Sequence, residues 1–127
     1  MTNNKPIVKA DDKTTNELLA TEVMGMTCHR MVNNGNEWYE YHRPDSSIIL
    51  LREDFSPTTD MNQAMECLQE FVSGYLYDVQ ITRTAYNMWR VNIDTVCEPH
   101  SLLANITNDS APLAICKAIA KAKGIDT

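Results

Sequence analysis

The chain has 127 residues, of which 43 % are hydrophobic and 22 % charged, a composition that fits one soluble globular domain. Its formal net charge of −6 argues against general affinity for nucleic acid, which needs a basic face, but permits binding to a basic protein. No apolar run approaches the ~20 residues that span a bilayer, and residues 1–6 lack the apolar region of a signal peptide. We therefore expect a cytoplasmic protein that does not insert into membranes.

The N-terminal part is predicted to be an arm followed by a helix. Residues 1–13 are polar and are expected to form a flexible arm, whereas residues 14–127 are expected to form a single domain. Thr14 and Glu17 have the spacing of a capping box, which predicts that a helix begins at Thr14. Gly25 suits the position that follows the end of this helix.

Three extended segments are predicted to follow. Residues 26–32 and 37–42 should form two strands, because the Asn-Asn-Gly-Asn sequence of residues 33–36 tolerates the positive φ of a tight turn. Residues 48–51 are all apolar and predict a short buried strand.

The segment from Asp60 to Ile93 predicts a helix, a turn and two paired strands. Asp60 suits the N-terminal cap of the helix, and Gly74 should end it. The helix has apolar residues at helical spacing on one face: Met61, Ala64, Met65, Leu68, Phe71 and Val72. Residues 75–82 and 88–94 alternate between apolar and polar side chains, which is typical of half-buried antiparallel strands.

The C-terminal part predicts an irregular segment and a last helix. Residues 97–108 read as irregular, and a helix should run from Ser110 to Gly124. Cys67 and Cys116 lie among apolar residues of predicted helices and are expected to be buried, reduced thiols. Together the elements predict an α+β fold in which helices cover a mainly antiparallel sheet.

We find no catalytic signature in the sequence. Cys28-His29 and Cys97-x-x-His100 are the local Cys/His groupings, and neither has the matching second pair of a zinc site. The carboxylates between Asp45 and Asp60 fit solvated or capping side chains, so a metal-dependent nuclease that uses them ranks last among the hypotheses. We therefore predict no enzyme activity, no cofactor and no metal.

Two groups of aromatic and basic residues are candidate binding surfaces, since Trp, Tyr and Arg are common binding anchors. One group consists of Trp38, Tyr39 and Tyr41 in the second predicted strand. The other consists of Arg83, Tyr86 and Arg90 near the turn of the later hairpin, where Trp89 is assigned to the core instead.

Four segments of the chain resemble the phage ABA-sandwich family. Residues 108–118, with their Ala-Pro-Leu-Ala-Ile-Cys sequence, resemble the helix that closes these proteins. Residues 17–25, 56–66 and 87–91 are similar to its opening helix, its Ser-Thr-Asp segment and its Trp-bearing strand. The resemblance implies an α-β-α sandwich encoded by a phage or prophage, with no known enzymatic activity and no catalytic residues to transfer.

These observations lead to two function hypotheses. The first is a non-enzymatic phage or prophage accessory protein that binds a host or phage protein in the host cytoplasm, for example as an inhibitor of host defence. The alternative is a homo-oligomer that binds or sequesters a nucleotide, with Arg83 and Arg90 on a phosphate and Tyr86 stacked on the base.

Overall fold

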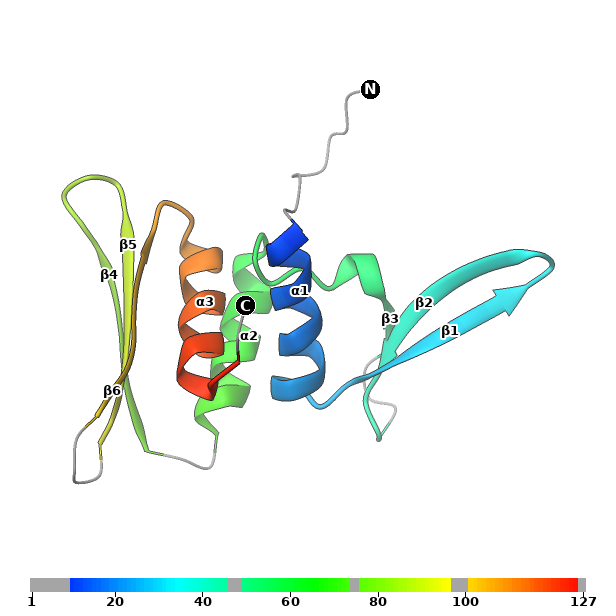
Figure 1. Cartoon of the computed structure of the whole chain (residues 1–127), viewed down its shortest axis with the longest axis horizontal. Helices are drawn as coiled ribbons and strands as arrows, with labels where there is room; N and C mark the ends of the chain where they lie inside the picture. Colours follow the sequence, from blue (N-terminus) through cyan, green and yellow to red (C-terminus); the bar gives the residue numbers. More distant parts are fainter. Residues whose placement is uncertain (1–9, 46–48, 74–75, 97–100, 126–127) are drawn as a thin grey trace.

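The computed structural model describes residues 10–45, 49–73, 76–96 and 101–125. Within them the elements follow in this order: α1 (Ala10–Leu18), the π-helical turn η1 (Leu19–Val23), β1 (Thr27–Asn33), β2 (Asn36–His42), β3 (Ile49–Leu51), the 3₁₀ turn η2 (Arg52–Asp54), α2 (Met61–Val72), β4 (Tyr77–Arg83), β5 (Trp89–Thr95), β6 (Leu102–Asn108) and α3 (Ala111–Lys123). The strands form two antiparallel sheets, β1–β2–β3 and β4–β5–β6. The helices lie between these sheets (Figure 1).

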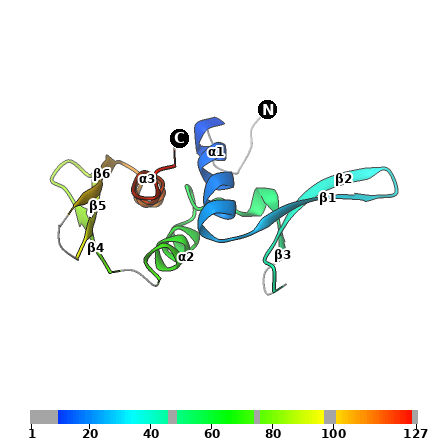
Figure 2. The same cartoon turned by 60° about the horizontal axis from the view of Figure 1, so that its bottom comes forward.

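The predicted α+β class, with antiparallel strands and helices packed on a sheet, is confirmed. α3 packs on β5 and β6, and α2 packs on α3. The sequence pattern predicts one sheet, whereas the described strands form two. The reason is that α2 and α3 separate β4–β5–β6 from the earlier strands, as both views in Figures 1 and 2 show.

The first helix begins earlier than predicted. α1 starts at Ala10, so residues 10–13 are helical instead of belonging to the arm, and Thr14 lies inside the helix instead of capping it. Residues 1–9, which we also assigned to the arm, lie outside the described residues. The polar sequence is misleading here because polar side chains on α1 are buried with partners of their own. Asn16, for example, is buried and accepts a hydrogen bond of 3.1 Å from the backbone N–H of Thr58.

The two later helices begin as their sequences predict. Asp60 caps α2, and its Oδ1 accepts a hydrogen bond from the Gln63 N–H at 3.1 Å. Ser110 caps α3, which ends at Gly124 with a φ of +80°. α2 ends at Val72, and Gly74, expected to end it, lies outside the described residues.

The core lies where α3 meets α2 and the inner face of β4–β5–β6. The buried residues of α3 are Ala114, Ile115, Cys116, Ala118, Ile119 and Ala120. They pack with Val91 and Ile93 of β5 on one side and Leu68 of α2 on the other. Cys67 and Cys116 are buried as predicted, and burial raises the pKa of the Cys67 thiol to about 12.

Two strand predictions need correction. Residues 102–108 form β6, although we expected them to be irregular, and β6 pairs with β5. Ala104 and Ile106 face the helices while polar residues alternate with them, so packing against α3 selects the strand. The strand predicted at residues 48–51 exists as β3 from Ile49 to Leu51, while Ile48 lies outside the described residues. It is not buried as predicted, since Ile49 is 59 % and Leu51 37 % exposed.

Candidate functional site

The hairpin of β1 and β2 projects from the body of the protein (Figures 1 and 2). Its strands pair in continuous register from Thr27 opposite His42 to Asn33 opposite Asn36. The turn uses Asn34 at a φ of 52° and Gly35 at a φ of 80°, which are the positive values that a two-residue hairpin turn requires. The predicted hairpin is therefore confirmed, and it extends beyond the core.

One face of the hairpin carries a network built around Glu37. Arg30 donates two hydrogen bonds to the Glu37 carboxylate, at 2.7 and 3.0 Å, and the Tyr39 hydroxyl donates a third at 3.2 Å. The guanidinium of Arg52 lies 4.1 Å from the centre of the Tyr39 ring. The hydrogen bonds from Arg30 lower the pKa of Glu37.

The opposite face carries a second network built around Glu40. The indole N–H of Trp38 donates to Glu40 Oε2 at 2.9 Å, and His42 Nε2 lies 2.9 Å from Glu40 Oε1. These contacts, that of Trp38 first, lower the pKa of Glu40. The ring of His29 stacks on His42 with centroids 4.2 Å apart.

The two networks add side-chain contacts to an element that has few contacts with the core. A two-stranded hairpin by itself is marginally stable in water, and cross-strand side-chain pairs are what stabilise it. The cross-strand contacts, Arg30 with Glu37 and His29 with His42, favour the paired form of the hairpin. A fixed shape reduces the entropy lost on binding a partner.

The structure separates the three aromatic residues that we proposed in β2. Tyr41 is only 2 % exposed and packs edge-on against Phe55, with ring centroids 5.8 Å apart. Burial raises the pKa of Tyr41 to about 12. Tyr41 therefore anchors the hairpin to the core, and its side chain is not on the surface. Trp38 and Tyr39 are partly exposed on opposite faces of the projecting part.

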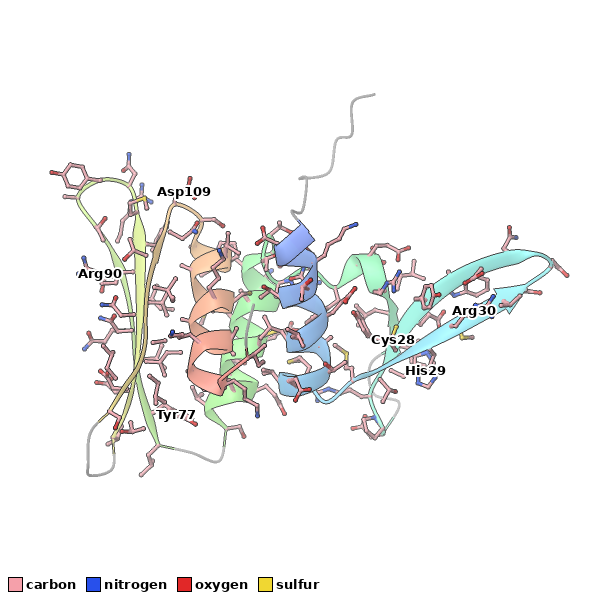
Figure 3. The ribbon with its side chains drawn as sticks, viewed as in Figure 1. Cys28, His29, Arg30, Tyr77, Arg90 and Asp109 are labelled. Carbon is pink, nitrogen blue, oxygen red and sulfur yellow. The ribbon has the colours of Figure 1, made fainter. Side chains whose placement is uncertain are left out.

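The second predicted group does not converge on one point. Arg83 pairs in register with Trp89, whereas Arg90 pairs with Thr82 on the opposite face of the sheet. Figure 3 shows Arg90 pointing away from the helices. Arg83 donates to Asn87 Oδ1 at 2.9 Å, and its guanidinium lies 5.2 Å from the centre of the Trp89 ring.

Tyr86, in the turn beside them, is 88 % exposed. Because Arg83 and Arg90 lie on opposite faces of the sheet, their side chains cannot bind the same phosphate group. The nucleotide hypothesis stays a prediction, but the arrangement that motivated it is not formed. Trp89 is partly buried against the core, as we expected.

The two candidate groups lie at opposite ends of the molecule, because β1–β2 projects on one side of the helices and the β4–β5 turn lies on the other (Figure 1). They cannot form a single site. None of the six predicted residues lines the hollow of about 560 Å³ at one end of β4–β5–β6, whose lining includes Tyr77, Asp78, Asp94 and Leu102.

The hairpin surface has further members that the sequence motifs do not indicate. Val32 is 60 % exposed at the far end of β1, and His29, Glu40 and His42 form the network described above. The sequence signal that could have identified these residues is the strand alternation of residues 27–33 and 36–42. Once the turn is known, this alternation assigns each side chain to one face of the hairpin.

Neither a metal centre nor a membrane span is found in the part of the chain that the structure describes. No three His, Cys, Asp or Glu side chains within it are grouped to hold a metal ion. Cys97 and His100 lie outside the described residues. No described helix has the length and apolar character needed to cross a bilayer.

Comparison with known proteins gives one match. The family model of the phage ABA sandwich domain matches residues 17–119. All four segments whose resemblance pointed to this family lie within the matched range. Searches of curated proteins and of solved structures found no match. Since the family model covers most of the sequence, the chain belongs to the phage ABA sandwich domain family.

Proposed function

We propose that the protein is a non-enzymatic phage or prophage accessory protein that binds another protein through its β1–β2–β3 sheet. The observation that carries this proposal is the projecting hairpin, which has a side-chain network on each face and, apart from Tyr41, adds no residue to the buried core. Binding of a partner protein would account for a hairpin that projects from the core in this way.

Exposed apolar and aromatic side chains support an interface on this sheet. Val32 and Ile49 are about 60 % exposed, and Trp38 and Tyr39 present part of their rings on opposite faces. The register places Val32 with Tyr39 on one face of the sheet and Ile49 with Trp38 on the other, so each face carries one exposed aliphatic and one partly exposed aromatic side chain. Trp and Tyr are also enriched among the residues that dominate binding energy.

The charge distribution supports a basic partner. Residues 1–73 contain twelve acidic and six basic side chains, whereas residues 74–127 contain five of each. The negative charge therefore belongs to the half of the chain that includes the hairpin. Such a field accelerates encounter with a positively charged partner and weakens as salt is added.

A stoichiometric inhibitor fits these features. Many proteins that bind nucleic acid have a basic surface, and an acidic protein in the host cytoplasm can occupy such a surface without catalysis. We therefore propose a host nucleic-acid-binding or defence protein as the target class. The alternative, a nucleotide-binding oligomer, is less favoured because Arg83 and Arg90 lie on opposite faces of their sheet.

Capture from host lysate tests this proposal. The tagged wild type, Trp38→Ala and Tyr86→Ala are compared at low and high salt. Tyr86 is a suitable control because it is an exposed aromatic residue of the β4–β5 turn, and that turn lies at the other end of the molecule (Figure 1). We expect wild type and Tyr86→Ala to retain the same partner at low salt and Trp38→Ala to lose it. Recovery of no specific protein at either salt, or loss caused by Tyr86→Ala instead, would contradict the proposal.

A further inference from the structure

We propose that two copies of this protein associate through the outer face of the β4–β5–β6 sheet, with the strands of the two copies antiparallel. This inference goes beyond the proposed function, since it concerns the other sheet and none of the hairpin residues. α3 packs on the inner face of β4–β5–β6, whereas no described element covers the outer face in either view (Figures 1 and 2). The outer face is therefore open to a second molecule, and the β1–β2 hairpin stays free on the far side of the helices.

The register defines which side chains form the outer face. Val91 and Ile93 of β5 are buried against the helices, so the alternate residues of β5 and their neighbours on β4 and β6 point outward. Three rows of these side chains cross the sheet: Thr82, Arg90 and Thr107; then Gln80, Asn92 and Asn105, the amide row; then Asp78 beside Asp94. All of them are exposed or partly exposed, and Figure 3 shows Arg90 pointing away from the helices.

A polar outer face is normal in an antiparallel sheet, but here the charges are separated along the strands. Asp78 lies directly opposite Asp94, and Arg90 lies about 13 Å away along β5. Carboxylates that face each other in this way destabilise a strand pair. Within the described residues neither aspartate forms an ion pair, and Arg90 forms none, not even with Asp109 just beyond β6. The face thus has an acidic end and a basic end that its own chain leaves without partners.

A second copy with antiparallel strands neutralises both ends. The twofold axis of such a dimer runs along the amide row, between the two sheets, so that Arg90 lies over Asp94 of the second copy and beside its Asp78. Packed sheets are about 10 Å apart, a distance that an Arg and an Asp side chain span together. The amide row meets its own copy, and amides both donate and accept hydrogen bonds. The face is therefore self-complementary, as a twofold interface requires.

Other occupants fit the charges of this face less well. In a dimer with parallel strands, Arg90 would face its own copy and the aspartates would face aspartates, and like charges at an interface disfavour association. A partner protein with a surface of one charge sign would be attracted by one end of the face and repelled by the other. A second copy in the antiparallel arrangement is attracted at both ends.

The size of the face sets the strength of the association. Three strands ~4.8 Å apart, with seven residues each at ~3.3 Å per residue, give a flat area of roughly 300 Å². Stable complexes bury about 800 Å² on each partner. We therefore expect a weak dimer that dissociates as salt is added.

Charge reversal on this face tests the inference. Arg90→Asp makes its three charged positions acidic, and the double variant Asp78→Arg/Asp94→Arg makes them basic. Each variant should repel its own copy, whereas the two variants should attract each other when mixed. Lys13→Asp is the matched control for Arg90→Asp, because it makes the same change of charge at an exposed position of α1, away from β4–β5–β6 (Figure 1).

Sedimentation equilibrium measures the association up to about 0.5 mM protein, in reducing buffer because Cys28 is exposed. We expect wild type and Lys13→Asp to dimerise with the same Kd, which rises with salt, and both face variants to raise Kd by about tenfold or more. An equimolar mixture of the two face variants should recover a dimer. Circular dichroism checks that each variant is folded. In the wild type, NMR shifts that depend on protein concentration should map to the amide row.

Three sedimentation results would overturn the inference. They are a wild type that stays monomeric over the whole concentration range, a dimer whose Kd is unchanged in Arg90→Asp, and a mixture of the two face variants that does not associate. Concentration-dependent NMR shifts confined to the β1–β2 hairpin would assign self-association to the other sheet and also reject this face. Lysate capture by the Trp38 surface is measured separately, so the proposed function can stand or fail independently of the dimer.

Discussion

Replacing Leu68 by Asp should unfold this protein. Leu68 is 6 % exposed on the face of α2 that packs in the core with Cys67 and Ala64. Removing most of a buried Leu side chain, as in Leu68→Ala, costs about 2–5 kcal/mol. An Asp at the same position also leaves a charge without a partner in an apolar environment, which costs several kcal/mol more.

The sum is comparable with the whole stability of a small domain, which is about 5–15 kcal/mol. For a domain of this size, roughly 4 °C of Tm corresponds to each kcal/mol, so Leu68→Ala should lower Tm by roughly 8–20 °C. Leu68→Asp should show no cooperative transition at all. Circular dichroism during heating measures both variants, and urea titration of Leu68→Ala checks the free energy of unfolding.

Gln69→Asp provides the control, because it introduces the same charge at an exposed position of the same helix. It should change stability by less than about 1 kcal/mol. A cooperative transition of Leu68→Asp at the wild-type Tm would refute the packing of α2 on α3 described here.

Three further predictions follow from local contacts. Cys28 is exposed, whereas Cys67 and Cys116 are buried and their thiols have raised pKa values. A thiol reagent at pH 8 should therefore label Cys28 quickly, and Cys67 and Cys116 only after denaturation, which peptide mass spectrometry can show. Fast labelling of Cys67 in the native protein would contradict its burial. Asp60→Ala should lower the free energy of unfolding by about 1 kcal/mol, measured by urea titration, because it removes the N-terminal cap of α2. Asp60→Asn can still cap the helix, so an equal loss of stability in that variant would argue against the capping role. The pKa of Glu37 lies below its ordinary value in the folded state. The contribution of this carboxylate to folding stability is therefore present above its unfolded pKa and is lost as pH falls through its folded pKa. NMR titration should show that Arg30→Gln raises the pKa of Glu37, and an unchanged pKa would disprove the pairing.

The elements that the sequence located depend on hydrogen bonds or φ angles within a few residues. The turn at Asn34 and Gly35, the caps at Asp60 and Ser110 and the end of α3 at Gly124 are all of this kind. A short segment contains all the atoms involved, so its sequence is sufficient to predict it. The family resemblance was also readable from the sequence, because it rests on four local motifs in order.

The tertiary structure decided the properties that depend on distant parts of the chain. β6 is a strand because Ala104 and Ile106 pack against α3, and the polar Asn16 of α1 is buried because it accepts a hydrogen bond from the Thr58 N–H. The separation of Trp38 from Tyr41 has the same origin. Alternation along β2 sets the face of each side chain, but burial depends on how far the side chain lies from the core. Tyr41 is buried, whereas Trp38 and Tyr39, which are nearer the turn of the hairpin, are partly exposed. Sequence alone therefore determined the candidate aromatic residues, and only the position of the hairpin relative to the helices decided which of them can meet a partner.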